Sequence, residues 1–105
     1  MDWLFLLLAG VCEIGWPLGL KVSQTTAHKA WGIVLAAVSM GMSGYLLWLA
    51  QRTIPLGTAY AVWTGIGAAG TFIVGILVYD DPSDFLRVAS VGLIIMGVIG
   101  LKLAH

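Results

Sequence analysis

Residues 3–20 read WLFLLLAGVCEIGWPLGL, an apolar run in which Glu13 is the one charged side chain. About 20 helical residues cross a hydrocarbon core of about 30 Å, so this run is long enough for a transmembrane helix. The rest of the chain is similar, because 60% of the 105 residues are apolar and 10% are charged. A water-soluble domain of this size could not bury so much apolar surface, whereas lipid accepts helices that are apolar all round. We therefore expect an all-α integral membrane protein.

Charged and turn residues divide the chain into four spans within a single four-helix domain, residues 1–105. The predicted helices cover residues 3–20, 30–49, 56–79 and 85–101. The connections are short, so consecutive helices are expected to be antiparallel neighbours. A cleaved signal peptide is not expected, because Asp2 stands where such a peptide carries basic residues.

Glu13 is the strongest functional signal in the sequence. A charged side chain near the middle of a span costs on the order of 3 kcal/mol to insert. All Lys and Arg residues fall at span ends or in connections, so none can neutralise Glu13 at its own depth. The expected partner is a proton or a bound cation. The alternative is a Glu13 that is permanently protonated and hydrogen-bonded as part of the helix packing.

The residues around Glu13 favour a binding site over simple packing. Gly10, Trp16 and Pro17 lie at helical spacing from Glu13, so the stripe mixes small, charged and aromatic residues. Pro17 has no N–H, which leaves the carbonyl four residues earlier, that of Glu13, without its helical donor. The sequence therefore predicts a bend or a free acceptor beside the carboxylate.

The second and third spans offer further polar groups. Tyr60, Trp63 and Thr64 share a stripe of the third span, and we expect Tyr60 and Trp63 to donate hydrogen bonds to Glu13. Their rings could also flank a flat cation. Ser43 adds a hydroxyl from the second span, although it could instead bond back to its own helix.

Glycines are concentrated in the third and fourth spans. Residues 65–70 read GIGAAG, which matches a dinucleotide-binding fingerprint in letters but lies inside an apolar span without a preceding strand. We therefore expect no nucleotide or nucleic-acid site, and interpret Gly65 and Gly67 as positions that shape close helix packing and a bend. Gly92, Gly97 and Gly100 make the fourth span a candidate dimer seam.

The basic residues are nearly balanced between the two membrane surfaces. One side would carry Arg52 and Lys102, and the other Lys21, Lys29 and Arg87. The excess of Lys and Arg normally sets orientation, so this chain has little preference. Two copies inserted in opposite directions would form an inverted repeat from separate molecules, an arrangement that many transporters encode within one chain.

These residues resemble the small multidrug resistance transporters, and within them the guanidinium exporter subtype, over essentially the whole chain. The similarity is strongest in residues 13–16 (EIGW), 55–67 (PLGTAYAVWTGIG) and 97–102 (GVIGLK). It differs at Pro17, where family members usually have Ala.

The resemblance implies an antiparallel, dual-topology homodimer in the bacterial inner membrane, with the fourth helix at the dimer contact. It implies a transporter rather than an enzyme, without cofactor or metal, that exchanges protons for guanidinium. The two copies of Glu13 would bind H+ or the cation alternately, and Trp16, Ser43, Tyr60 and Trp63 would line the site. Guanidinium is planar and always charged, so its N–H groups suit paired carboxylates and its face suits aromatic rings.

Two other functions remain open at this point. The same groups could bind bulky aromatic or quaternary ammonium cations, as in a broad-range multidrug exporter. A small helical channel or scaffold could instead use Glu13 for packing or for passive cation selectivity.

Overall fold

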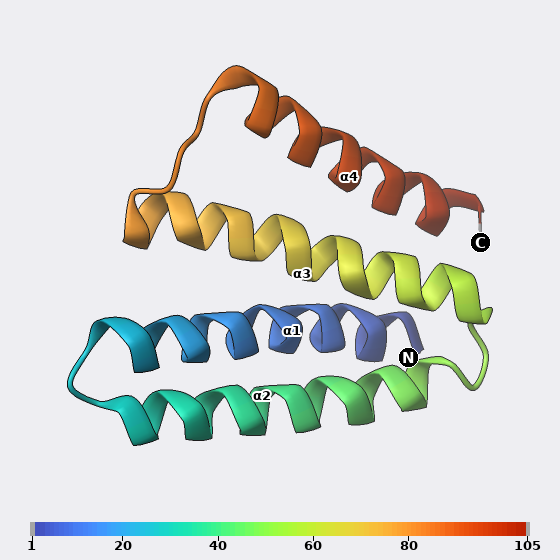
Figure 1. Ribbon diagram of the computed structural model, residues 1–105. Coiled ribbons are helices and arrows are strands. Elements are labelled where there is room, and N and C mark those ends of the chain that lie inside the picture. Colours follow the sequence, from blue (N-terminus) through green and yellow to red (C-terminus); the bar gives the residue numbers. More distant parts are fainter. Residues whose placement is uncertain (1, 105) are drawn as a thin grey trace.

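Four α-helices make up the computed structural model, which describes residues 2–104 (Figure 1). They are α1 (Asp2–Thr25), α2 (Lys29–Ala50), α3 (Leu56–Tyr79) and α4 (Phe85–Ala104). Each is long and apolar enough to cross a membrane, which confirms the predicted all-α membrane fold with four spans. The predicted bounds of the third helix agree with the structure.

Helices α1 and α4 extend well past their predicted ends, and α2 is longer by one residue at each end. Helix α1 continues past Lys21 to Thr25, and α4 reaches Ala104. The additional turn of α1 is supported by hydroxyl groups that bond to its own carbonyls, Ser23 to Leu20 at 2.6 Å and Thr25 to Lys21 at 2.8 Å. A helix therefore does not have to end where the apolar span ends, because its last turn can lie among the lipid headgroups.

The helices stand in the order α2, α1, α3, α4 (Figure 1). Helix α1 packs against both α2 and α3, whereas α2 and α3 touch only slightly. The expectation that consecutive helices are neighbours is therefore wrong for α2 and α3. The connection between these helices passes the start of α1, where the Thr53 hydroxyl donates to the Asp2 carboxylate.

Small residues allow α1 and α2 to approach closely. A Cβ atom added to Gly19 would lie 2.7 Å from the carbonyl oxygen of Gly32, a distance that side chains do not reach. The apolar core lies toward the other end of α1, where it meets the α2–α3 connection and the start of α3. Its buried residues are Leu6, Ala50, Ile54, Ala59 and Val62.

The described chain forms a thin layer with principal extents of 44 × 34 × 17 Å. A helix with its side chains is about 10–12 Å across, so the layer is little more than one helix thick. No residue of α4 is buried, and a Cβ added to Gly92, Gly97 or Gly100 would meet no atom within 4 Å. The predicted dimer seam is thus an open surface of the single chain, and its role stays a prediction.

Basic side chains at the helix ends lie over aromatic rings. The Lys21 ammonium is 5.7 Å from the centroid of Tyr79, and the Lys102 ammonium is 4.9 Å from that of Trp3. Aromatic and basic residues both favour the interface between lipid and water. These pairs therefore mark the two ends of the helical layer.

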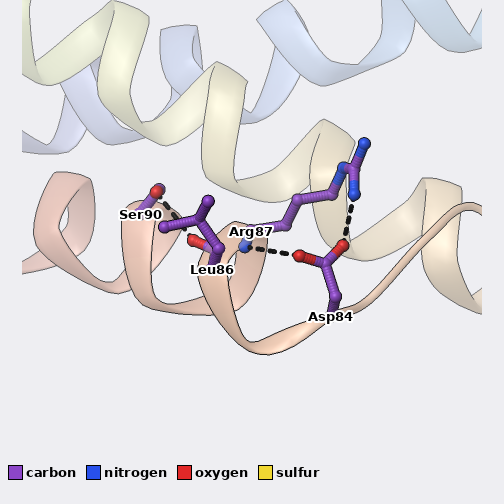
Figure 2. A network of polar contacts seen from close by, with 4 residues as sticks. All are labelled: Asp84, Leu86, Arg87 and Ser90. Carbon is purple, nitrogen blue, oxygen red and sulfur yellow. Dashed lines mark hydrogen bonds and ion pairs between the residues drawn. The ribbon is translucent and has the colours of Figure 1, made fainter.

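Helix α4 begins with a local network of polar contacts (Figure 2). The Asp84 carboxylate accepts a hydrogen bond from the Arg87 backbone N–H at 3.4 Å and forms an ion pair with the Arg87 guanidinium. That side-chain bond holds the pKa of Asp84 below its usual range. One turn later, the Ser90 hydroxyl donates to the Leu86 carbonyl at 2.7 Å.

Candidate functional site

Glu13 faces α3 at the position of Gly67. A Cβ added to Gly67 would lie 2.5 Å from Cγ of Glu13, so the absence of a side chain there makes room for the carboxylate. Glu13 is half-buried, and no ion pair involves it anywhere in residues 2–104. The carboxylate is therefore held in an apolar layer without a basic partner among the described residues.

A groove of about 430 Å³ opens beside this carboxylate. It runs between α1 and α3 toward the connection that follows α3. The residues that line it are Glu13, Pro17, Thr64, Gly67, Ala68, Thr71, Phe72 and Asp81. The space is comparable to that of a small-molecule site, which spans about 300–1,000 Å³.

Trp16 orients the Glu13 carboxylate. Its indole Nε1–H donates to Oε1 of Glu13 at 2.7 Å, across three residues of the same helix. A donor at this distance interacts more strongly with an ionised carboxylate than with a neutral acid. The predicted proximity of Trp16 to Glu13 is thus present in the structure.

Ser43 connects three helices. Its side chain is fully buried; the hydroxyl donates to the Ala9 carbonyl of α1 at 2.8 Å and accepts the indole N–H of Trp63 from α3 at 2.7 Å. The alternative in which Ser43 bonds to its own helix is therefore wrong. So is the expected bond from Trp63 to Glu13, because an indole has a single N–H and that of Trp63 is used by Ser43.

Tyr60 packs against Trp63 rather than beside Glu13. The two ring centroids are 5.5 Å apart with an interplanar angle of 49°, and Tyr60 is 56% exposed. The structure thus places the predicted site residues in two groups. Glu13, Trp16, Pro17, Thr64 and Gly67 gather at the groove, whereas Ser43, Tyr60 and Trp63 form a separate hydrogen-bonded and aromatic group.

The predicted site-shaping glycines Gly10 and Gly65 lie at helix contacts. A Cβ on Gly10 would be 2.7 Å from Cβ of Ile66, and one on Gly65 would be 2.5 Å from Cγ2 of Val98. Gly10 therefore sets the approach of α1 to α3, and Gly65 that of α3 to α4. Residues 65–70 are helical throughout, so the glycine run does not form the strand-to-helix turn that a dinucleotide site requires.

Comparison with known proteins identifies the family. The family described as "Small Multidrug Resistance protein" matches residues 1–94. The chain belongs to this family. A relative named guanidinium exporter from Yersinia pseudotuberculosis is 46% identical over 104 residues, 99% of each chain. A protein of the same name from Citrobacter freundii is 45% identical, over 99% of this chain and 98% of its own. Another from Proteus vulgaris is 44% identical, over 99% of each chain.

As a small multidrug resistance protein with four apolar spans, the chain is a multi-pass transporter of the inner membrane and not an enzyme. Three polar or aromatic residues of the groove were not predicted from the sequence, namely Thr71, Phe72 and Asp81. Thr71 could have been found, because it lies four residues after Gly67 on the same face of the helix. Asp81 could not, because it follows α3 in a connection whose path the sequence does not indicate.

Proposed function

We propose that this protein exports guanidinium across the inner membrane in exchange for protons. In this scheme it works as an antiparallel homodimer in which one Glu13 from each subunit binds H+ or the cation alternately. The observation that carries the proposal is the groove-lining Glu13 carboxylate, which has no ion-pair partner in the described chain. An acid in that position is stable in the membrane when it holds a proton or a cation, so the two compete for one site.

The substrate class follows from the relatives and from the chemistry of the groove. The relatives that cover nearly the whole chain are named guanidinium exporters. Guanidinium presents N–H donors in a plane, which fits carboxylate oxygens, and Thr64 and Thr71 add hydroxyl acceptors along the same groove. The exposed Tyr60 ring and the neighbouring Trp63 ring could contact the flat face of the cation at a second place on its path, separate from the groove.

The shape of the single chain favours a dimer. A layer 17 Å thick cannot enclose a cation on all sides, and α4 packs only against α3 and buries none of its residues. Gly92, Gly97 and Gly100 lie on this helix with open space around them, which allows the close approach of another helix. Opposite insertion of the two copies agrees with the nearly equal number of basic residues at the two ends of the layer.

Transport into proteoliposomes tests the proposal. Vesicles with an acidic interior and a membrane potential clamped at zero should accumulate radiolabelled guanidinium against its own gradient. The matched control is Glu13→Gln, which keeps the shape of the protonated acid and an acceptor for Trp16 but can neither ionise nor exchange a proton. We expect wild-type accumulation and none with the variant.

Other outcomes would select a different function. Accumulation of a tetraalkylammonium ion but not of guanidinium would support a broad-range multidrug exporter. Guanidinium that only equilibrates, with no response to the pH gradient, would indicate a channel. Accumulation by Glu13→Gln equal to that of the wild type would contradict the role of Glu13.

A further inference from the structure

A second carboxylate, that of Asp81, lines the same groove as Glu13. Asp81 also lines an adjoining cavity of about 170 Å³ with Lys21 and Tyr79, at the end of the layer where α1 and α3 finish. We propose that Asp81 is the outer cation-attracting residue of the transport path, which collects guanidinium at the membrane surface and delivers it to Glu13. This inference rests on the proposed function and adds a residue to it.

The position of Asp81 is set by the backbone at the end of α3. Asp80 has a left-handed conformation, with φ of 54°, which reverses the chain after the helix. The backbone N–H of Asp81 then donates to the Gly75 carbonyl at 3.1 Å. The Asp81 carboxylate lies directly against Gly75, in space that a Cβ at that position would occupy. The carboxylate is thus folded back along α3.

The two carboxylates occupy equivalent places on one face of α3. Glu13 lies against Gly67 and Asp81 against Gly75, and these glycines are eight residues apart, about 12 Å along the helix. Thr71 lies midway between them and lines both cavities. The face therefore presents a carboxylate, a hydroxyl and a second carboxylate in sequence, from the middle of the membrane to its surface.

The charges around Asp81 leave it free to attract a cation. Within residues 2–104 an ion pair joins Arg87 and Asp84, whereas Asp81 forms none. The nearest basic side chain in the adjoining cavity is Lys21, whose ammonium lies over the Tyr79 ring. In an antiparallel dimer one Asp81 would stand at each membrane surface, so the same residue would serve both uptake and release.

The test compares two adjacent carboxylates. Asp81→Asn and Asp80→Asn each remove one negative charge from the same loop, but Asp80 lines neither cavity, and Asn tolerates the left-handed conformation of Asp80. Initial rates of guanidinium uptake would be measured in proteoliposomes from an alkaline bath, where protons compete least. For unit charges about 12 Å apart we expect Asp81→Asn to raise the apparent KM about two- to tenfold at low salt. Asp80→Asn should change it less than about twofold.

A second variant tests the same idea without removing a charge. Gly75→Ala places a methyl group where the Asp81 carboxylate lies, and the three atoms nearest to that methyl group all belong to Asp81, so it should push the carboxylate out of the groove. We expect it to raise the KM as Asp81→Asn does, and the double variant to be no worse than either single one. Gly75→Ala also carries the test if Asp81→Asn fails to fold.

Ionic strength distinguishes attraction from a structural effect. Screening acts over about 30 Å at about 0.01 M salt and about 3 Å at about 1 M, so the KM difference should vanish at the higher concentration. Equal KM values for Asp81→Asn and Asp80→Asn, or a deficit unchanged by salt, would overturn this inference alone. A wild-type protein that does not transport guanidinium would overturn the proposed function and the inference with it.

Discussion

The indole N–H of Trp16 and the carboxylate of Glu13 are joined by a hydrogen bond of 2.7 Å. The bond spans three residues of one helix, so it does not depend on how α1 packs against its neighbours. Trp63, by contrast, uses its only N–H for Ser43. The two tryptophans that the sequence predicted for the site therefore have different roles: Trp16 orients the ionisable group, and Trp63 links helices.

The first prediction separates these two roles. Trp16→Phe keeps an aromatic ring but deletes the donor that favours the ionised Glu13, so a proton competes better with the cation. We expect a weaker apparent affinity, on the order of 1 kcal/mol near neutral pH, and a deficit that shrinks as the pH rises. Guanidinium titrations at several pH values measure it.

Trp63→Phe is the matched comparison. Its N–H does not reach Glu13, so any loss of affinity should be the same at every pH. A pH-dependent deficit for Trp63→Phe, with a constant one for Trp16→Phe, would contradict the assignment of the two tryptophans.

Ser43 is expected to contribute mainly to the stability of the folded protein and less to cation binding. Ser43→Ala leaves the part-buried Trp63 N–H without its acceptor and removes the bond to Ala9, which should destabilise the protein by about 1–2 kcal/mol. The control is Ser90→Ala, because Ser90 is exposed and bonds only within its own helix. Unfolding in detergent measures both variants, and similar stabilities would argue against the role of Ser43 as a link between helices.

Gly67 tests whether the space for Glu13 is necessary. Gly67→Ala would bring a methyl group 2.5 Å from Cγ of Glu13, so either the carboxylate or α1 must shift. We expect proton-driven uptake to fall at least about tenfold, since displacing a functional group by about 1 Å can lower a rate about 100-fold. Gly41→Ala is the control, because a Cβ there meets nothing within 4 Å. Equal activity of the two variants would exclude the proposed contact.

The orientation of the chain is tested by added charge. In the wild type, labelling of cysteines placed at each end of α4 should find copies in both orientations, because the basic residues are nearly balanced. Three Lys residues added after Lys102 should force one orientation and abolish activity. Coexpression with a copy biased the opposite way should restore uptake. Wild-type copies that all face one direction would refute dual insertion.

The last prediction concerns the start of α4. Arg87 lowers the pKa of Asp84, so the stabilising effect of this carboxylate is present above its usual pKa of about 3.9 and is lost as the pH falls through the lower folded value. Asp84→Asn should therefore unfold at a lower temperature than the wild type at pH 7, by a small amount since the pair is exposed. At a pH low enough to protonate Asp84 in the folded protein as well, the two proteins should agree. A difference that persists there would mean that Asp84 acts other than through its charge.

The local features of the site could be predicted well from the sequence. Glu13, Trp16 and Pro17 are neighbours on one helix, so the 3.6-residue period is enough to place them on one side. Gly67 was expected to permit close packing, and it does so against Glu13 itself. The prediction failed where two helices were involved, because the partner of Trp63 depends on how α2 and α3 are placed around α1.

The sequence by itself determined the number of spans, their approximate ends and the isolation of Glu13, because hydrophobic length and the position of charges are properties of one segment at a time. Only the tertiary structure decided that α1 lies between α2 and α3, that Ser43 reaches Ala9 and Trp63, and that Asp81 returns to the groove of Glu13. These relationships join residues from different helices or from a connection. They depend on glycine contacts and on a left-handed turn at Asp80, which act through distances in space that no pattern along the chain records.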